Sequence, residues 1–129
     1  MNKKSMPWYG TELFESLKGR TLIKVERHED TIEFETTDGE CFLMFYDQDC
    51  CADVYIDEIH GDLSDLVGSP ILNAEERTSQ DNPKNSDDDS FTWTFYELAT
   101  IKGSVTIRWY GESNGYYSET ASFERIKNE

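Results

Sequence analysis

Hydrophobic and polar residues alternate along most of the chain, which is the pattern of half-buried β-strands. The alternation is clearest in the last third, where residues 91–95, 105–110 and 117–123 each follow a period of two. Lys102-Gly103 and Asn114-Gly115 separate these segments, and Asn-Gly is the strongest two-residue hairpin signal. The sequence therefore predicts an antiparallel meander in the last third of the chain.

The first half of the chain predicts a second group of strands. Residues 23–27 and 32–35 alternate in the same way and are joined by a turn at Glu29-Asp30. Asp38-Gly39 is another hairpin signal, and it leads into residues 41–46, an apolar run without polar alternation. We expect this run to be a central strand that is covered on both faces. Shorter extended segments are expected at residues 54–56 and 70–76.

Helical signals are few and short. Thr11 could cap a helix over residues 12–18, which Gly19 would end. Residues 61–68 are expected to form one or two helical turns that close at Gly68. These segments predict one or two short helices beside the sheet.

Length and loop composition predict one domain. A chain of 129 residues fits a single domain and leaves little room for two. Residues 78–90 lack apolar side chains and predict an acidic surface loop, and residues 1–9 are expected to be flexible. We therefore expect a single α+β domain over residues 1–129, mainly an antiparallel β-sheet of about six to seven strands with one or two short helices.

Composition narrows the classes of function. The chain has 27 acidic and 12 basic residues, a net charge of −15, and 13% of its residues are aromatic. The aromatic content is too high for a disordered acidic tail, and the shortage of Lys and Arg excludes binding to nucleic acid or anionic membranes by charge neutralisation. Without a secretory signal or an apolar run of about 18 residues, we expect a soluble cytoplasmic protein.

The negative charge is concentrated in the middle of the chain. Residues 28–97 contain 20 acidic residues against Arg77 and Lys84, a local net charge of −18. Two interpretations stay open: a solvated surface that serves solubility, or a surface that binds a partner. If the charge binds a partner, the expected contact residues are Asp53, Asp57, Glu58, Asp62, Asp65, Asp87, Asp88 and Asp89.

A short segment around the adjacent cysteines holds residue types that bind zinc. The candidate ligands are Asp49, Cys50, Cys51 and His60, with Cys41 as an alternative to Asp49. Their spacing matches no known zinc module, so the alternative is a pair of small buried thiols. Because adjacent cysteines rarely bond each other and the number of cysteines is odd, we expect a reduced protein. A zinc-binding or thiol-dependent protein is therefore the second hypothesis.

Aromatic residues flank the loop of the last predicted hairpin. Tyr110, Tyr116 and Tyr117 lie around it, with Trp109 beside them. They predict either a recognition patch or a simple cover for the sheet edge. Together with Arg108 they could bind a small signalling nucleotide, which is the third hypothesis, although the overall charge would repel such an anion.

Two groups of motifs carry a family resemblance. The first lies in residues 40–76 and includes Gln48-Asp49-Cys50-Cys51, Gly61-Asp62-Leu63, Gly68-Ser69-Pro70-Ile71 and Ala74-Glu75-Glu76. The second lies in residues 90–118 and includes the runs SFTWTFY and TIRWYGESNGYYS. Over about residues 19–127 the chain resembles an uncharacterised family of small phage and prophage proteins. The resemblance implies a mobile-element context without a mechanism, and Tyr46 stands where this family often has a histidine, which removes a potential ligand.

The acidic block and the resemblance together favour an inhibitory binding protein. In general character the chain is similar to anti-CRISPR and other anti-defence inhibitors, and Cas9-like nucleases hold nucleic acid in a positively charged channel. The chain lacks a phosphate-binding glycine loop, a nucleophile elbow and a His-Glu-x-x-His motif. We therefore expect a phage-derived, non-enzymatic acidic protein that blocks a host nucleic-acid-binding defence nuclease through protein–protein contact.

Overall fold

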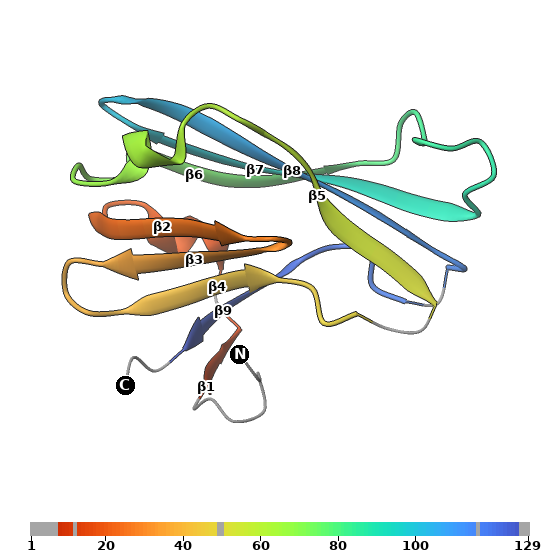
Figure 1. Cartoon of the computed structure of the whole chain (residues 1–129), viewed down its shortest axis with the longest axis horizontal. Helices are drawn as coiled ribbons and strands as arrows, with labels where there is room; N and C mark the ends of the chain where they lie inside the picture. Colours follow the sequence, from red (N-terminus) through yellow and green to blue (C-terminus); the bar gives the residue numbers. More distant parts are fainter. Residues whose placement is uncertain (1–7, 12, 49–50, 116, 127–129) are drawn as a thin grey trace.

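The chain folds into two antiparallel β-sheets that face each other (Figure 1). The computed structural model describes residues 8–11, 13–48, 51–115 and 117–126. The five-stranded sheet has the order β1 (Trp8–Thr11), β9 (Ser122–Ile126), β4 (Cys41–Phe45), β3 (Thr31–Thr36) and β2 (Leu22–His28). The four-stranded sheet has the order β5 (Ala52–His60), β8 (Gly103–Ser113), β7 (Ser90–Thr100) and β6 (Asn73–Ser79).

A single large hydrophobic core fills the space between the sheets. Phe123 lies near its centre: its ring is stacked on Phe42 at a centroid distance of 5.3 Å and meets Phe14 edge-on at 5.4 Å. Fully burying a phenylalanine side chain contributes about 1.5–3 kcal/mol. The opposite sheet contributes buried side chains that include Val54, Ile56, Tyr96, Leu98, Ile107 and Trp109.

The predicted α+β class is wrong, because the described residues form an all-β fold. Nine strands replace the six to seven that were expected. Both expected helices are single 3-10 turns of four residues, η2 (Phe14–Leu17) and η3 (Leu63–Leu66). Segments this short do not recover the free-energy cost of starting an α-helix, so the chain forms isolated turns between strands. The first turn follows Leu13 rather than a cap at Thr11.

The predicted C-terminal meander is correct only for its first hairpin. β7 and β8 pair along their whole length, from Ser90 opposite Ser113 to Thr100 opposite Gly103. The third strand, however, begins at Ser122 and pairs with β4 and β1 in the other sheet. β8 already has β7 on one edge and β5 on the other, so it has no free edge on which a third hairpin strand could pair.

Two further expectations meet different outcomes. Residues 41–45 of the predicted run 41–46 are confirmed as a central strand, since β4 lies between β9 and β3 and all five of its residues are buried, whereas Tyr46 follows the strand and is half-buried. Residues 8 and 9, expected to be flexible, belong to β1, and the rest of that segment (1–7) lies outside the described residues. No helical segment in the described part of the chain is long and apolar enough to cross a membrane.

The four-stranded sheet is the longer of the two. β7 and β8 have 11 residues each, whereas β4 and β9 have five. In Figure 1 the ends of β5, β7 and β8 on the right extend past β2, β3 and β4. The candidate functional surface lies on the outer face of this sheet, which points away from the core.

Candidate partner-binding surface

Aromatic side chains form a strip on the outer face of the four-stranded sheet. On β7, the side chains of Thr92 and Thr94 point toward the core. The aromatic residues that alternate with them are half-buried on the opposite face: Phe91, Trp93 and Phe95. Trp93 lies opposite Tyr110 of β8, with ring centroids 4.5 Å apart. Tyr110 also contacts two further rings, at centroid distances of 6.1 Å and 6.2 Å. We define the aromatic strip as Tyr55, Phe91, Trp93, Phe95 and Tyr110.

The loop between β6 and β7, residues 80–89, is fastened to this strip by hydrogen bonds. The indole Nε1–H of Trp93 donates to the carbonyl oxygen of Asn82 at 3.0 Å. The backbone N–H of Lys84 donates to the hydroxyl oxygen of Tyr110 at 3.1 Å, and that hydroxyl donates to Asp88. The acidic surface loop predicted from the sequence is therefore a strap across the sheet, and it leaves Tyr110 only 1% exposed.

One aspartate neutralises two cations, Lys84 of the strap and Arg108 of β8. Asp57 lies 2.6 Å from Nζ of Lys84 and accepts a hydrogen bond of 2.7 Å from Arg108. Burial by itself would raise the pKa of Asp57, but the hydrogen bonds from Lys84 and Arg108 outweigh it and leave the pKa below its usual value. Lys84 also donates to the hydroxyl of Tyr55 at 2.8 Å. This network holds β5, β8 and the strap together.

Carboxylates gather where the outer face extends past the other sheet. Asp53 of β5 lies directly opposite Glu112 of β8. The pKa of Glu112 is raised, first by burial and then by the negative charges of Asp88, Asp53, Glu119 and Asp89. We define the acidic end as Asp53, Asp88, Asp89 and Glu112.

The predicted contact residues do not share one face. Asp53, Asp88 and Asp89 belong to the acidic end, and Asp87 is exposed beside them in the strap. Asp57 is almost buried, with 11% of its side chain exposed, and Glu58 accepts a hydrogen bond of 2.7 Å from Arg108. Both of these carboxylates are therefore compensated within the protein.

The last two predicted contact residues lie at the opposite end of β8. Asp62 caps η3 by accepting a hydrogen bond of 3.0 Å from the backbone N–H of Ser64. Asp65 lies within η3, and its carbonyl oxygen accepts a hydrogen bond from Thr100. Since β8 spans roughly 30 Å, these two residues cannot act on the same small contact as the acidic end.

Of the four predicted zinc ligands, the structure describes two, Cys51 and His60, and it does not bring these two together. Asp49 and Cys50 lie outside the described residues. Cys51 precedes β5 and His60 ends it, so the nine-residue strand keeps them about 30 Å apart. Within the described ranges, no three His, Cys, Asp or Glu side chains are placed to hold a metal ion.

The cysteines also differ from the expected reduced state. Cys51 is disulfide-bonded, and a cysteine in a disulfide carries no thiolate for a metal. Cys41, the alternative ligand, is a free and buried thiol that packs with Leu43, Phe45 and Ile126. His60 forms an exposed ion pair with Glu58 at 3.0 Å.

The predicted aromatic patch at the last hairpin is split by the fold. Trp109 points into the core and is fully buried, Tyr117 is exposed, and Tyr116 lies outside the described residues. Arg108, proposed to bind a nucleotide with Trp109, instead lies over Trp93 on the outer face, 5.3 Å from the ring centroid. The sequence did contain the signal for the real strip, since the 91–95 segment alternates aromatic residues with threonine. The alternation alone did not show which side of the strand faces the core.

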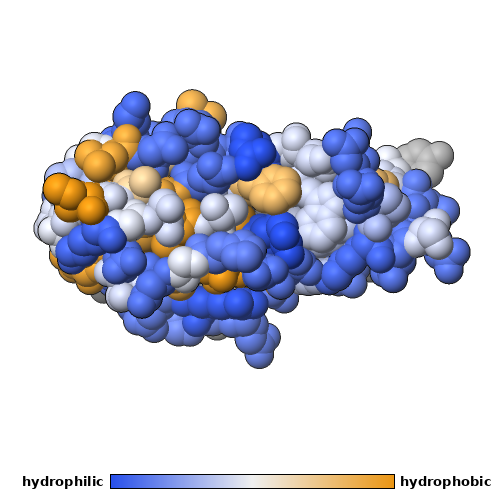
Figure 2. All heavy atoms as spheres, turned by 90° about the horizontal axis from the view of Figure 1, so that it is seen from above, coloured by the Kyte–Doolittle hydropathy of each residue, from blue (hydrophilic) through white to orange (hydrophobic). Residues whose placement is uncertain are grey.

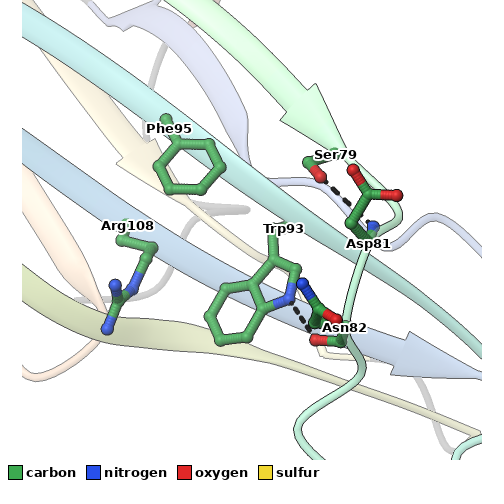
Figure 3. Close-up of a pocket in the computed structure, with 6 residues that line it drawn as sticks. All are labelled: Ser79, Asp81, Asn82, Trp93, Phe95 and Arg108. Atoms are coloured by element: carbon green, nitrogen blue, oxygen red, sulfur yellow. Dashed lines mark hydrogen bonds between the residues drawn. The ribbon is translucent and has the colours of Figure 1, made fainter.

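Beside the strip, the outer face is hollowed. The hollow has a volume of about 390 Å³ and lies between the strap and β7 (Figure 3). Figure 2 views the molecule from this side: hydrophilic residues cover most of the face, and the most hydrophobic ones gather toward the end at the left. The lining residues are Ser79, Asp81, Asn82, Trp93, Phe95 and Arg108.

Comparison with known proteins gives one match. A family model described as a domain of unknown function (DUF7448) matches residues 15–123. No curated protein matches the chain. No solved structure matches it either.

Proposed function

The chain belongs to this DUF7448 family of domains of unknown function, and from that premise we propose that it is an acidic binding module that docks onto a basic surface of another protein. The contact surface is the outer face of the four-stranded sheet, including the acidic end where this face extends past the other sheet. The protein acts by occupying the partner's surface and carries out no reaction of its own.

The observation that supports this proposal most directly is the position of the acidic end beside the aromatic strip. Tyr110 links the two, since its hydroxyl donates to Asp88 while its ring packs against Trp93. Protein interfaces combine aromatic anchors with charged groups that steer the encounter and fix the register. The paired strands and the strap hold both sets of groups in place before any partner arrives.

Like charges at the acidic end also favour a cationic partner. Asp53 and Glu112 face each other across paired strands, and carboxylates opposite one another are destabilising. This repulsion decreases when a Lys or Arg of a partner approaches. Relief of the repulsion then contributes to the free energy of binding. A surface that served solubility alone would gain nothing from placing these carboxylates side by side.

The specific form of the proposal is a phage-derived inhibitor of the anti-CRISPR kind. A Cas9-like nuclease holds its heteroduplex in a positively charged channel, which is a basic surface of the type that the acidic end would attract. Docking there would exclude nucleic acid by competition. The negative net charge of −15 supports steering toward such a channel and opposes binding to the nucleic acid itself.

Binding of octalysine, followed by calorimetry at low and moderate salt, tests the general proposal. The triple variant Asp53→Asn, Asp89→Asn, Glu112→Gln should bind at least about threefold more weakly, because surface charge pairs contribute about 0.2–1 kcal/mol each. The control Glu15→Gln, Glu26→Gln, Glu29→Gln removes the same charge from exposed residues elsewhere. Equal affinity of the two variants would contradict the proposal.

Inhibition of a guide-loaded Cas9-type nuclease tests the specific form. DNA cleavage should fall when the wild-type protein is added and recover with the acidic-end variant, while the control variant should inhibit like the wild type. Cleavage that is unaffected by the wild-type protein would contradict this form and leave the general proposal to the octalysine measurement.

A further inference from the structure

The hollow on the outer face brings two aromatic rings and a carboxylate together. Trp93 and Phe95 are two positions apart on β7, so both rings project from the same face of the sheet. Asp81, at the start of the strap, stands on the side of the hollow opposite Phe95 (Figure 3). The space of about 390 Å³ between them accommodates one side chain of a partner.

The protein's own arginines show how this surface holds a guanidinium group. Arg77 lies over Phe95, with Cζ 5.0 Å from the ring centroid, and pairs with Glu97. Arg108 lies over Trp93 in the same way at 5.3 Å and pairs with Asp57. In both cases the guanidinium lies over the ring and a carboxylate accepts hydrogen bonds from its N–H groups.

Asp81 provides another carboxylate beside the same rings. Its side chain is exposed, and within the described part of the chain its carboxylate has no ion-pair or hydrogen-bond partner. Only its backbone N–H is bonded, donating to Oγ of Ser79 at 3.2 Å. Arg77 and Arg108 each cover part of these rings, and the parts that line the hollow, together with the uncompensated negative charge of Asp81, suit a planar cation.

Charge and hydration decide which cation fits. A phosphate-bearing ligand would meet Asp81 and the strap's other aspartates, while Arg108 is already held by Asp57 and Glu58. A lysine ammonium is compact and strongly hydrated, whereas a guanidinium is planar, weakly hydrated and stacks on aromatic rings. We propose that the hollow binds an arginine side chain of the partner. This inference rests on the proposed function, since the arginine belongs to the basic surface that the acidic end attracts.

A three-residue peptide, acetyl-Gly-Arg-Gly-amide, is the probe for this site, added to the full chain and compared with its lysine and citrulline counterparts. The NMR signal of the Trp93 indole Nε1–H, assigned with Trp93→Phe, reports on the hollow. The arginine peptide should shift this signal, the lysine peptide should bind about threefold to fivefold more weakly, and the uncharged citrulline peptide should not bind.

Asp81→Asn keeps the size of the side chain and removes its charge. It should weaken binding of the arginine peptide by about threefold to tenfold. Glu75→Gln is the matched control, because Glu75 is an exposed carboxylate of the neighbouring strand β6, paired in register with Glu97 and away from the hollow. This control should bind the peptide like the wild type.

Three results would overturn the inference: equal binding of the arginine and lysine peptides, unchanged binding by Asp81→Asn, or an equal shift of the Trp93 signal by a thymidine oligonucleotide. The octalysine measurement separates this failure from that of the proposed function. If octalysine binds through the acidic end while the arginine peptide does not select the hollow, only the arginine site is refuted. If octalysine does not bind at all, the proposed function is refuted.

Discussion

The indole N–H of Trp109 donates a hydrogen bond of 3.2 Å to the sulfur of Met44, across the core and between the two sheets. Both side chains are fully buried, and Trp109 has the largest side chain among the fully buried residues. A buried indole N–H needs a partner, since an unsatisfied donor costs about 1–3 kcal/mol. This bond therefore couples the burial of Trp109 to the position of β8 relative to β4 in the opposite sheet.

Met44→Leu should destabilise the protein by about 1–2 kcal/mol, because leucine fills most of the space but accepts no hydrogen bond. Urea unfolding of the purified variants measures the change. In the background of Trp109→Phe, which has no N–H, the same substitution should cost clearly less. An equal cost in both backgrounds would show that the contact is packing alone.

Gly111 should not tolerate a side chain, because the chain crosses β8 at this residue. A Cβ added at Gly111 would lie 2.1 Å from the carbonyl oxygen of Glu119. Gly111→Ala should therefore destabilise by about 3 kcal/mol or more, since backbone rather than a flexible side chain stands in the way. Gly103→Ala, on the same strand, is the control, because its nearest neighbour is the side chain of Asp65, which can move. Thermal unfolding of both variants compares them, and similar melting temperatures would argue against the crossing.

Two buried threonines of β7 should respond to the same substitution in opposite directions. Thr92 donates a hydrogen bond of 2.8 Å to the buried carboxylate of Glu119, which also accepts one of 2.6 Å from Ser113. Thr92→Val removes a bond to a charged group and should destabilise by about 1.5–3 kcal/mol. Among the described residues, the buried hydroxyl of Thr94 has no partner, so Thr94→Val should be stabilising by up to about 1 kcal/mol. Chemical unfolding of the two variants should give free energies that change in opposite directions; destabilisation of both by the same amount would contradict the assignment.

The same two threonines explain how far the sequence predicted this fold. The period of two correctly located strands such as β3, β7 and β8, because alternation depends only on the local chain. It did not reveal which side of β7 faces the core. Thr92 and Thr94 are buried, and Trp93 between them faces the strap. That choice depends on the opposite sheet and on the loop that covers the rings, and both are distant in sequence.

Long-range pairing also explains the errors in topology and in the site. The departure of β9 to the other sheet follows from the occupied edges of β8, which no local pattern records. The predicted acidic contact surface included Asp57, whose charge is neutralised by Lys84 of the strap, 27 positions away in the sequence. Glu112 was not predicted, because it joins the acidic end only through its register opposite Asp53.

The acidic end should make stability depend on pH in a way that one substitution can isolate. The folded-state pKa of Glu112 is raised, by burial and by the charges of neighbours that include Asp88 and Asp53. A raised pKa means that the folded protein binds this proton more tightly than the unfolded chain does. The stabilisation is complete below the ordinary glutamate pKa of about 4.3 and is lost as the pH rises through the folded-state value.

Glu112→Gln should therefore stabilise the protein at pH 7, where the wild-type carboxylate is charged, and this gain should disappear near pH 4, where it is protonated. Asp57→Asn provides the opposite sign: its pKa is lowered, so loss of its charge should destabilise at pH 7 and matter less as the pH falls through that value. Urea unfolding at pH 7 and at a pH well below the ordinary aspartate pKa of about 3.9 measures the effect of Asp57→Asn, and unfolding at pH 4 and pH 7 measures that of Glu112→Gln. If Glu112→Gln changed stability equally at the two pH values, repulsion at the acidic end would not be the cause, and its proposed relief by a basic partner would lose its physical basis.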